Sequence, residues 1–482
     1  MADDNRVRDV ANSAFLDYYR CPEMFADFTL SGSLSGTSGY FRFGPDAICY
    51  GRCAGMAPAG HPTDQLHDAL EDVTAEATTL RLSFNPTEIV TNLRYERYIS
   101  SADETQGRRF LHQTYYQIRP LLPVPVRKHL QRIELRKWRQ IGFPDWPVDL
   151  TVENIFAKLL ALLLERPSIG RIPFIWFWPN GASSCAIMTH DVETLAGRDF
   201  CSSLMDLNDA YGIKASFQII PESRYEVPRS FLDQIRRREF EIGVHDLNHD
   251  GLLFRDRERF LLRAERINQY GQEYGACGFR AGALYHNLDW YGALNFSYDM
   301  SIPSVGHLEA QRGGCCSVMP FFVGRILELP VTVVQDYSLF NILGEYSTAL
   351  WKCQVAQIME HHGLASFIAH PDYLQEVRAR GAYESLLAYL ADLRSQGKIW
   401  IALPGEVNKW WRARSQMKLV RHGNDWVIDG PESDKARVAY AILEGGRLTY
   451  EFEYQRRTAL SRPEEQSKSE VVKCVPSRLA LR

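Results

Sequence analysis

The chain has 482 residues, of which 45% are hydrophobic, 24% charged and 12% aromatic. This length exceeds one ordinary core, so two or three domains are expected, with room for one of barrel size. The formal net charge of −4 excludes a general attraction to nucleic acid, and no nucleic-acid partner is predicted. The longest uninterrupted apolar run has six residues, Leu159 to Leu164, which is too short to span a membrane.

The first residues, Met1 to Arg6, are polar and acidic, and no apolar signal segment follows them. Because a secretory signal needs such a segment, a cytoplasmic location is predicted. The ten cysteines include no C-x-x-C pair. This usage fits reduced thiols better than a disulfide framework or a structural zinc site.

Residues 1–150 are predicted to form an N-terminal α+β module. Segment 32–50 is rich in glycine, serine and aromatic residues and alternates in polarity, which is typical of short strands. Residues 126–139 mix basic with aliphatic side chains and are expected to be helical. Such a helix can make peripheral contact with an anionic membrane, or it can be a linker with a solvated basic face, which is the favoured interpretation.

From about residue 183 to 405, short apolar runs alternate with amphipathic segments. This alternation indicates parallel βαβ units, and residues 151–410 are predicted to form a (β/α) barrel of seven or eight units, with catalytic residues at the carboxyl ends of the strands. The expected strands are 185–188, 215–220, 241–244, 278–279, 326–331, 366–369 and 399–403. The expected helices are 198–211, 228–238, 256–274, 348–362 and 383–396.

Residues 411–482 change pattern again. Short alternating stretches at 425–428, 437–442 and 447–454 predict a small β appendage. Gly445-Gly446 is suited to a hairpin turn between the last two of them. The remainder of the chain, from Arg456, is a polar tail.

Three polar segments follow predicted strands: Thr189–Glu193, His245–His249 and Ala369–Asp372. A helical or tight turn after the second strand would place His245 and His249 on one side. Carboxylates and imidazoles are ordinary ligands of a catalytic divalent ion that keeps a position open for water. Arg280 ends a further strand, and charged side chains are rarely buried without partners. The sequence therefore predicts a metal site at the carboxyl ends of these strands.

The motifs Met188–Glu193, His245–His249, Phe279–Gly282 and Phe367–His370 resemble those of the NodB-type polysaccharide deacetylases, carbohydrate esterase family 4. In that family they read Thr-Phe-Asp-Asp-Gly, His-Ser/Thr-x-x-His, Arg-x-Pro-Tyr and a strand ending in His. The resemblance covers about residues 183–405. It implies a distorted TIM-type barrel, an N-acetylated sugar substrate and a divalent metal, with Zn²⁺ as the expected ion and Co²⁺, Ni²⁺ or Fe²⁺ as alternatives.

The first motif departs from the family pattern, because Asp191-Val192-Glu193 replaces the usual Asp-Asp doublet. Asp191 could be the base with Glu193 as the ligand, or Asp191 could itself be a ligand, and both assignments stay open. The predicted metal ligands are therefore Asp191, Glu193, His245 and His249. His190 stands at the usual Phe position, where it either joins the site or lies beside it.

The resemblance also implies catalytic roles for Asp191, Arg280 and His370. Asp191 would take the proton of a metal-activated water, Arg280 would keep Asp191 ionised, and His370 would protonate the departing nitrogen. The Pro-Tyr pair is missing after Arg280, which weakens the expectation of a polymer groove. Two alternatives follow: a hydrolase of a non-sugar amide, and a carbohydrate-binding protein whose catalytic site has decayed.

Overall fold

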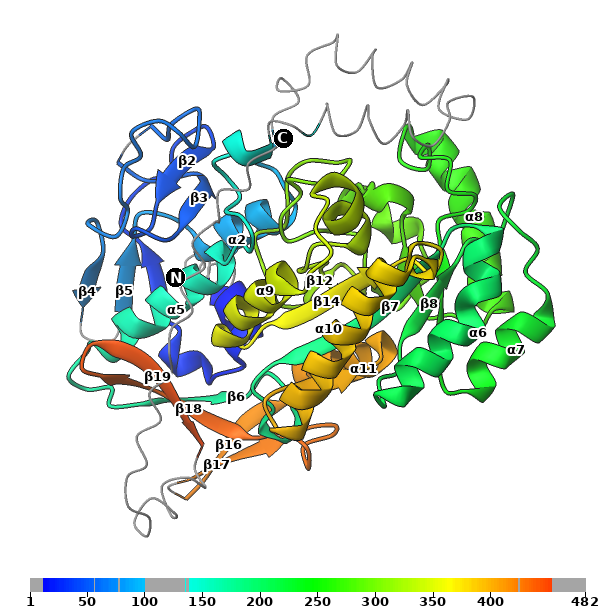
Figure 1. Ribbon diagram of the computed structural model, residues 1–482. Helices are drawn as coiled ribbons and strands as arrows, with labels where there is room; N and C mark the ends of the chain where they lie inside the picture. The colour runs from blue at the N-terminus through cyan, green and yellow to red at the C-terminus, as the bar shows by residue number, and fades with distance from the viewer. Residues whose placement is uncertain are drawn as a thin grey trace.

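The fold is α/β, as the alternating pattern predicted. The computed structural model describes residues 12–55, 57–76, 79–99, 135, 138–423 and 425–452. In Figure 1 a curled central sheet carries helices on its outer face, while the N-terminal strands and the last strands of the chain lie beside it.

The central sheet has nine strands in the order β12-β13-β11-β10-β9-β8-β7-β14, and β15 also pairs with β7. All of its pairings are parallel except that of β12 with β13. The carboxyl ends of the parallel strands therefore meet at one edge. The strands are β7 (Cys185–Val192), β8 (Ser216–Ile219), β9 (Glu241–His245), β10 (Gly278–Arg280), β11 (Tyr298–Asp299), β12 (Phe321–Val323), β13 (Ile326–Glu328), β14 (Leu364–Ala369) and β15 (Trp400–Ala402).

The sheet curls without a continuous ladder around its circumference. Within the described ranges, no strand pairing joins β14 to β13. Instead, the Thr332 hydroxyl donates to the Leu364 carbonyl at 2.6 Å and accepts from the Ser366 N–H at 2.9 Å. This side chain takes the place of ladder bonds at the gap, so an irregular segment after β13 completes the inner wall.

Helices cover the outer face of the sheet (Figure 1). Most expected boundaries agree with the observed ones to within three residues, but α10 begins six residues before the expected start at Tyr383. The helix includes Gly381, and Ala379 and Ala382 are buried on its inner face. The helices are α6 (Leu195–Ala210), α7 (Arg229–Arg237), α8 (Arg257–Glu273), α9 (Ala349–Glu360), α10 (Val377–Ser395) and α11 (Pro404–Gln416).

The N-terminal part contains two small sheets. One has the order β1-β5-β4, and β2 pairs with β3 in the other, so strands do form in the segment where glycine and aromatic residues alternate. The elements are η1 (Glu23–Phe25), β1 (Phe28–Leu30), β2 (Gly39–Arg42), β3 (Ile48–Gly51), β4 (Thr74–Glu76), β5 (Thr79–Leu82) and α2 (Pro86–Arg94). We refer to residues 12–99 as the N-terminal module.

One of the last strands of the chain pairs with a strand from the middle of the sequence. β18 (Val438–Glu444) pairs with β19 (Arg447–Phe452) across a Gly445-Gly446 turn in which both residues have positive φ, 57° and 79°. β18 also pairs with β6 (Ile172–Ile175). A separate hairpin joins β16 (Lys418–His422) to β17 (Asp425–Asp429).

Two large apolar cores support this arrangement. One lies between the central sheet and its outer helices. The other joins the N-terminal module, α5 (Thr151–Leu164), β6 and β18, and it extends to Cys185 and Ile187 at the start of β7. The amino end of the curled sheet therefore packs against the module, which leaves the carboxyl edge for the polar motifs.

Two predicted features lie outside the described residues. The predicted basic helix, residues 126–139, is described only at residues 135, 138 and 139, and the polar tail from Arg456 is not described at all. No helix in the described part of the chain combines the length and the apolar character needed to cross a bilayer.

Gly278 tests the packing of β10. A Cβ added there would lie 2.2 Å from the ring of Tyr298, which is fully buried. We expect Gly278→Ala to lower the free energy of unfolding by about 1–3 kcal/mol, because the ring cannot move aside without disturbing the core. Gly292, whose Cβ would meet no atom within 4 Å, is the matched control, and Gly292→Ala should change stability by less than about 1 kcal/mol. Urea unfolding of both variants measures the difference; equal losses would contradict the predicted contact.

Candidate metal and hydrolytic site

The end of β7 sends alternate side chains to opposite faces of the sheet. Thr189 and Asp191 point into the curl, where Nη1 of Arg280 donates to the Thr189 hydroxyl at 2.7 Å and to Oδ1 of Asp191 at 2.6 Å. All three side chains are buried. The sequence predicted that Asp191 and Arg280 would meet at this edge, and the structure brings them together.

His190 faces the other way, toward the outer helices. Its Nδ1 donates to the Ala369 carbonyl at 3.2 Å, and its Nε2 accepts from the Asn208 amide at 3.0 Å. Burial lowers the pKa of His190 to about 4, so this imidazole is neutral near pH 7. His190 thus packs behind the strand and has no side-chain contact with the predicted ligands.

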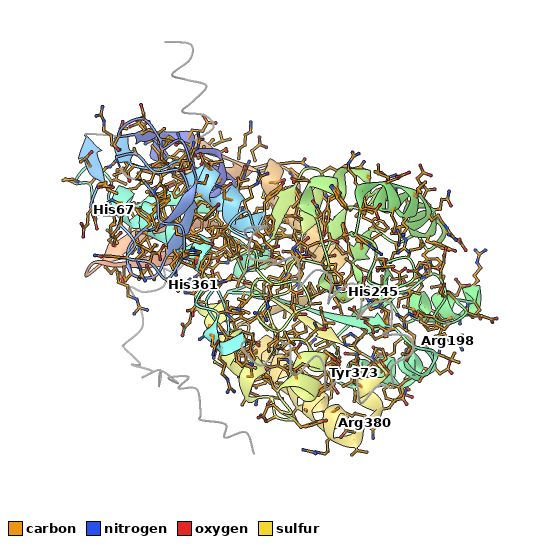
Figure 2. The ribbon with its side chains drawn as sticks, turned by 90° about the horizontal axis from the view of Figure 1, so that it is seen from above. His67, Arg198, His245, His361, Tyr373 and Arg380 are labelled. Atoms are coloured by element: carbon orange, nitrogen blue, oxygen red, sulfur yellow. The ribbon has the colours of Figure 1, made fainter. Side chains whose placement is uncertain are left out.

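Glu193, His245 and His249 form one group whose candidate ligand atoms all lie within 4.8 Å of one another. Oε1 of Glu193 is 3.0 Å from Nε2 of His249 and 3.7 Å from Nε2 of His245. Two ligands in a tetrahedral zinc site are about 3.3 Å apart, given zinc bonds of about 2.0–2.1 Å. In Figure 2, His245 lies well away from His67 of the N-terminal module.

The backbone fixes the orientation of His245. Its Nδ1 donates to the Arg280 carbonyl at 3.1 Å, which leaves Nε2 as the basic nitrogen. That Nε2 is buried and has no hydrogen-bond partner among the described residues. A buried polar atom without a partner is costly, and a cation held between His245, His249 and Glu193 would satisfy it. The residues present therefore fit a divalent metal.

A tight turn, rather than a helix, carries the second histidine. Asp246 and His249 both have positive φ, 55° and 53°. The turn brings the two imidazole rings to a centroid distance of 4.9 Å. Gly282 lies directly against it, since a Cβ there would be 2.5 Å from Oδ2 of Asp246 and 3.0 Å from Cδ2 of His249. Only glycine fits at this close approach.

Asp191 lies next to the metal-ligand group but outside it. Its Oδ2 is 3.8 Å from Nε2 of His245, while its Oδ1 is held by Arg280. Burial alone would raise the pKa of Asp191, but Arg280, His245 and His370 together hold it below its usual value. The pKa of Glu193 also falls well below its usual range, because the opposing effect of burial is exceeded by the interactions with His249, His245 and His370.

His370 reaches the same edge from β14. Its Nε2 is 3.5 Å from Oε1 of Glu193. Its Nδ1 lies 2.6 Å from Oδ1 of Asp336, and its backbone N–H donates to the other oxygen of that carboxylate at 2.7 Å. Burial alone would lower the pKa of His370, but Asp336 and Glu193 raise it well above its usual value. The protonated form therefore persists at neutral pH.

The sequence reasoning missed Asp336, which is completely buried. Its sequence signal is weak, since it lies two residues after Val331-Thr332-Val333-Val334, a segment interrupted by a polar residue. This segment forms no named strand and is joined to β14 by the hydrogen bonds of the Thr332 side chain. Asp372, two residues after His370, makes no side-chain cap bond to η8 (Tyr373–Gln375).

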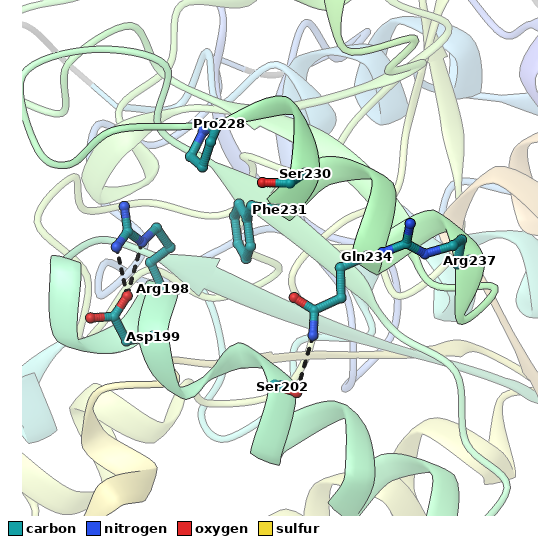
Figure 3. Close-up of a pocket in the computed structure, with 8 residues that line it drawn as sticks. All are labelled: Arg198, Asp199, Ser202, Pro228, Ser230, Phe231, Gln234 and Arg237. Atoms are coloured by element: carbon teal, nitrogen blue, oxygen red, sulfur yellow. Dashed lines mark hydrogen bonds and ion pairs between the residues drawn. The ribbon is translucent and has the colours of Figure 1, made fainter.

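A separate surface cavity of about 510 Å³ lies between α6 and α7. Figure 3 shows the Phe231 ring between polar neighbours there. Arg198 is already engaged by Asp199 at 2.7 Å and by the Glu226 carbonyl at 2.8 Å. None of the predicted site residues lines this cavity. Its lining residues are Arg198, Asp199, Ser202, Pro228, Ser230, Phe231, Gln234 and Arg237.

No family model and no curated protein matches the chain. Solved structures do match, in 33 chains. A Mycobacterium smegmatis protein described as a polysaccharide deacetylase matches with 18% identity and a TM-score of 0.40, over 52% of this chain and 98% of its own. The allantoinase Puue matches with 11% identity and a TM-score of 0.39, over 49% of this chain and 92% of its own.

The peptidoglycan deacetylase PdaC of Bacillus subtilis matches with 14% identity and a TM-score of 0.30, over 48% of this chain and 93% of its own. The names of the two deacetylases agree with the family that the motifs resemble. These TM-scores lie below 0.5, and the chemistry of the site rests on this chain's own residues.

Metal content tests the ligand group. We expect purified protein to bind one zinc ion, and we expect His245→Ala to weaken binding by more than about a hundredfold, because it removes a direct ligand. His190→Gln is the matched control, since this side chain lies in the same segment but on the opposite face of β7. Elemental analysis and competition with a chelating dye give stoichiometry and affinity. Retention of zinc by His245→Ala, or its loss in His190→Gln, would show that the metal lies elsewhere.

Proposed function

We propose that this protein is a divalent-metal-dependent hydrolase that removes the N-acetyl group from an amino sugar of a glycan, glycoconjugate or sugar-containing metabolite. One observation carries the proposal. The carboxyl edge of the curled sheet holds a two-histidine, one-carboxylate ligand set between a buried Asp191–Arg280 pair and a buried His370–Asp336 pair. Amide hydrolysis needs an activated water, a base and an acid, and this edge has residues suited to each.

Glu193, His245 and His249 would hold the ion, with Zn²⁺ as the first candidate and Co²⁺, Ni²⁺ or Fe²⁺ as alternatives. A bound divalent ion supplies Lewis acidity, which lowers the pKa of water and polarises the substrate carbonyl. Of the two assignments that the sequence left open, the geometry favours Glu193 as the carboxylate ligand. Its Oε1 lies within 3.7 Å of both imidazole Nε2 atoms, whereas Asp191 is bound to Arg280.

Asp191 would act as the base. Arg280 engages Oδ1, so Oδ2 faces the ligand group and can accept a proton from water. The positive charge of Arg280 keeps the carboxylate ionised, and the hydrogen bond fixes its orientation. A base that is both ionised and fixed accepts the proton without rearranging.

His370 would act as the acid. Asp336 holds its Nδ1, so that the proton on Nε2 points into the site. The leaving nitrogen of the amide has to gain a proton before it departs, and Nε2 of His370 lies 3.5 Å from Oε1 of Glu193. Base and acid would therefore both lie beside the ligand group that holds the amide.

The same groups would also hydrolyse a non-sugar amide, because the chemistry is identical up to the leaving group. The absence of Pro-Tyr after Arg280 keeps that alternative open. A decayed binding protein is the less favoured alternative, because the candidate ligands, base and acid are all present. The cytoplasmic location and the membrane contact of residues 126–139 stay predictions.

Acetate release tests the proposed activity. We expect zinc-loaded protein to release acetate from N-acetylglucosamine oligomers or nucleotide-linked N-acetylamino sugars, measured by an enzyme-coupled acetate assay. Asp191→Asn should retain zinc and lose about 10²–10⁴-fold in kcat, the usual contribution of a general base. His190→Gln should keep the activity. Zinc-loaded protein that releases no acetate from these sugars but hydrolyses a cyclic amide would replace the proposal with the alternative.

The pH dependence tests the assignment of the acid. The raised pKa of His370 means that kcat/KM should fall only as alkaline pH removes its proton. Asp336→Asn removes the negative charge that raises this pKa, so the alkaline fall should move to lower pH. Rates measured from pH 5 to 10 on both proteins give the shift. An alkaline limb that stays in place while activity drops would mean that another group donates the proton.

A further inference from the structure

The loop that follows Arg280 is unusual in its backbone. Ala283 and Leu284 both have a φ of 54°, in the left-handed region that costs energy for residues other than glycine. The loop passes Gly282 against His249, as described above. Such a conformation persists only when its surroundings hold it.

The far end of the turn reaches across the curl of the sheet. Leu284 packs with Val331 and Ile368 in a small buried cluster separate from both large cores. Ile368 lies on β14, two residues before His370, whereas Leu284 follows β10. The turn therefore touches the ligand His249 at one end and the strand of the proposed acid at the other.

The next residues bind the N-terminal module. Nδ1 of His286 donates to the Leu284 carbonyl at 2.9 Å, and Nε2 lies 2.8 Å from Oε2 of Glu96. Both side chains are more than nine-tenths buried, with exposures of 7% and 8%. Burial would lower the pKa of His286, but Glu96 raises it above its usual value, which favours the charged form of this imidazole beside the carboxylate.

Glu96 is fully used at this junction. Its Oε1 accepts from the Gly314 N–H at 2.6 Å, and its Oε2 also accepts from Gln311 at 3.3 Å. Gln311 in turn accepts from the His286 N–H at 3.1 Å. One carboxylate from the module thus fixes two loops of the sheet domain. Breaking a buried pair by removing one partner is strongly destabilising locally, because the other charge stays buried.

We propose that Glu96 is a positioning residue of the hydrolytic site: through its ion pair with His286 it holds the Gly282–Leu284 turn against His249. This inference rests on the proposed function and adds a role for the N-terminal module. The module is then a part of the site's wall, rather than only a cover for the amino end of the sheet.

The test compares Glu96→Gln with Glu153→Gln in the full-length, zinc-loaded protein. Glu153 is the matched control, because it is also a buried glutamate, and it joins α5 to a loop of the sheet domain. It accepts from the Ser317 hydroxyl at 2.7 Å and from the Val318 N–H at 3.2 Å. It does not contact the Gly282–Leu284 turn.

Three measurements are made on each variant. Hydrogen exchange of the peptide covering residues 281–288 should accelerate at least tenfold in Glu96→Gln and stay unchanged in Glu153→Gln. The zinc stoichiometry should stay at one. The value of kcat/KM should fall by about 10–100-fold in Glu96→Gln, because small misplacements of a site wall have effects of this size.

A double-mutant cycle with His286→Gln shows whether the effect travels through the pair. In the His286→Gln background, Glu96→Gln should add little further loss. Unchanged exchange at 281–288, or full additivity of the two variants, would overturn the positioning role. If the wild-type protein shows no deacetylase activity but the exchange results hold, the proposed function fails while the structural link between Glu96 and the turn stands.

Discussion

The structure of the site depends on one buried guanidinium. Arg280 is completely buried, and a buried charge is costly without partners. Its Nε donates to the Met300 carbonyl at 2.9 Å, and Nη1 donates to Thr189 and Asp191. Its own carbonyl accepts from Nδ1 of His245 and from the Asp246 N–H at 2.8 Å. One residue therefore fixes the proposed base, the tautomer of one proposed ligand and the start of the turn that carries the other.

The sequence could predict which residues gather at the carboxyl edge of the sheet, because strand alternation and parallel pairing leave few possible positions for their side chains. Asp191, Arg280, His245 and His370 each end an apolar run, and parallel strands bring such ends together. The alternation of β7 also settles the place of His190, one residue away from Asp191 and on the opposite face. The pattern could predict that the two differ in direction. It could not say which of them faces inward, because both faces of this sheet are buried.

The missing information concerned groups that act from outside regular strands. Asp336 and Thr332 lie in an irregular segment that is joined to β14 by side-chain hydrogen bonds. Such a segment shows no strand periodicity in the sequence. Glu96 and His286 are 190 residues apart in the sequence. Such a pairing depends on how the module docks, which local sequence does not encode.

The second core explains why the module can act on the site at all. It extends from the N-terminal module to Cys185 and Ile187 on β7, so the module is packed against the strand that also carries Asp191. A module joined only by a flexible linker would add its contact with His286 at a considerable entropic cost. Here the large apolar core already holds the module in place. The Glu96 ion pair therefore has only to orient a short turn. The apolar core stabilises the docked module, whereas the Glu96–His286 contact positions the turn. A variant at Glu96 should therefore disturb the turn without unfolding the protein.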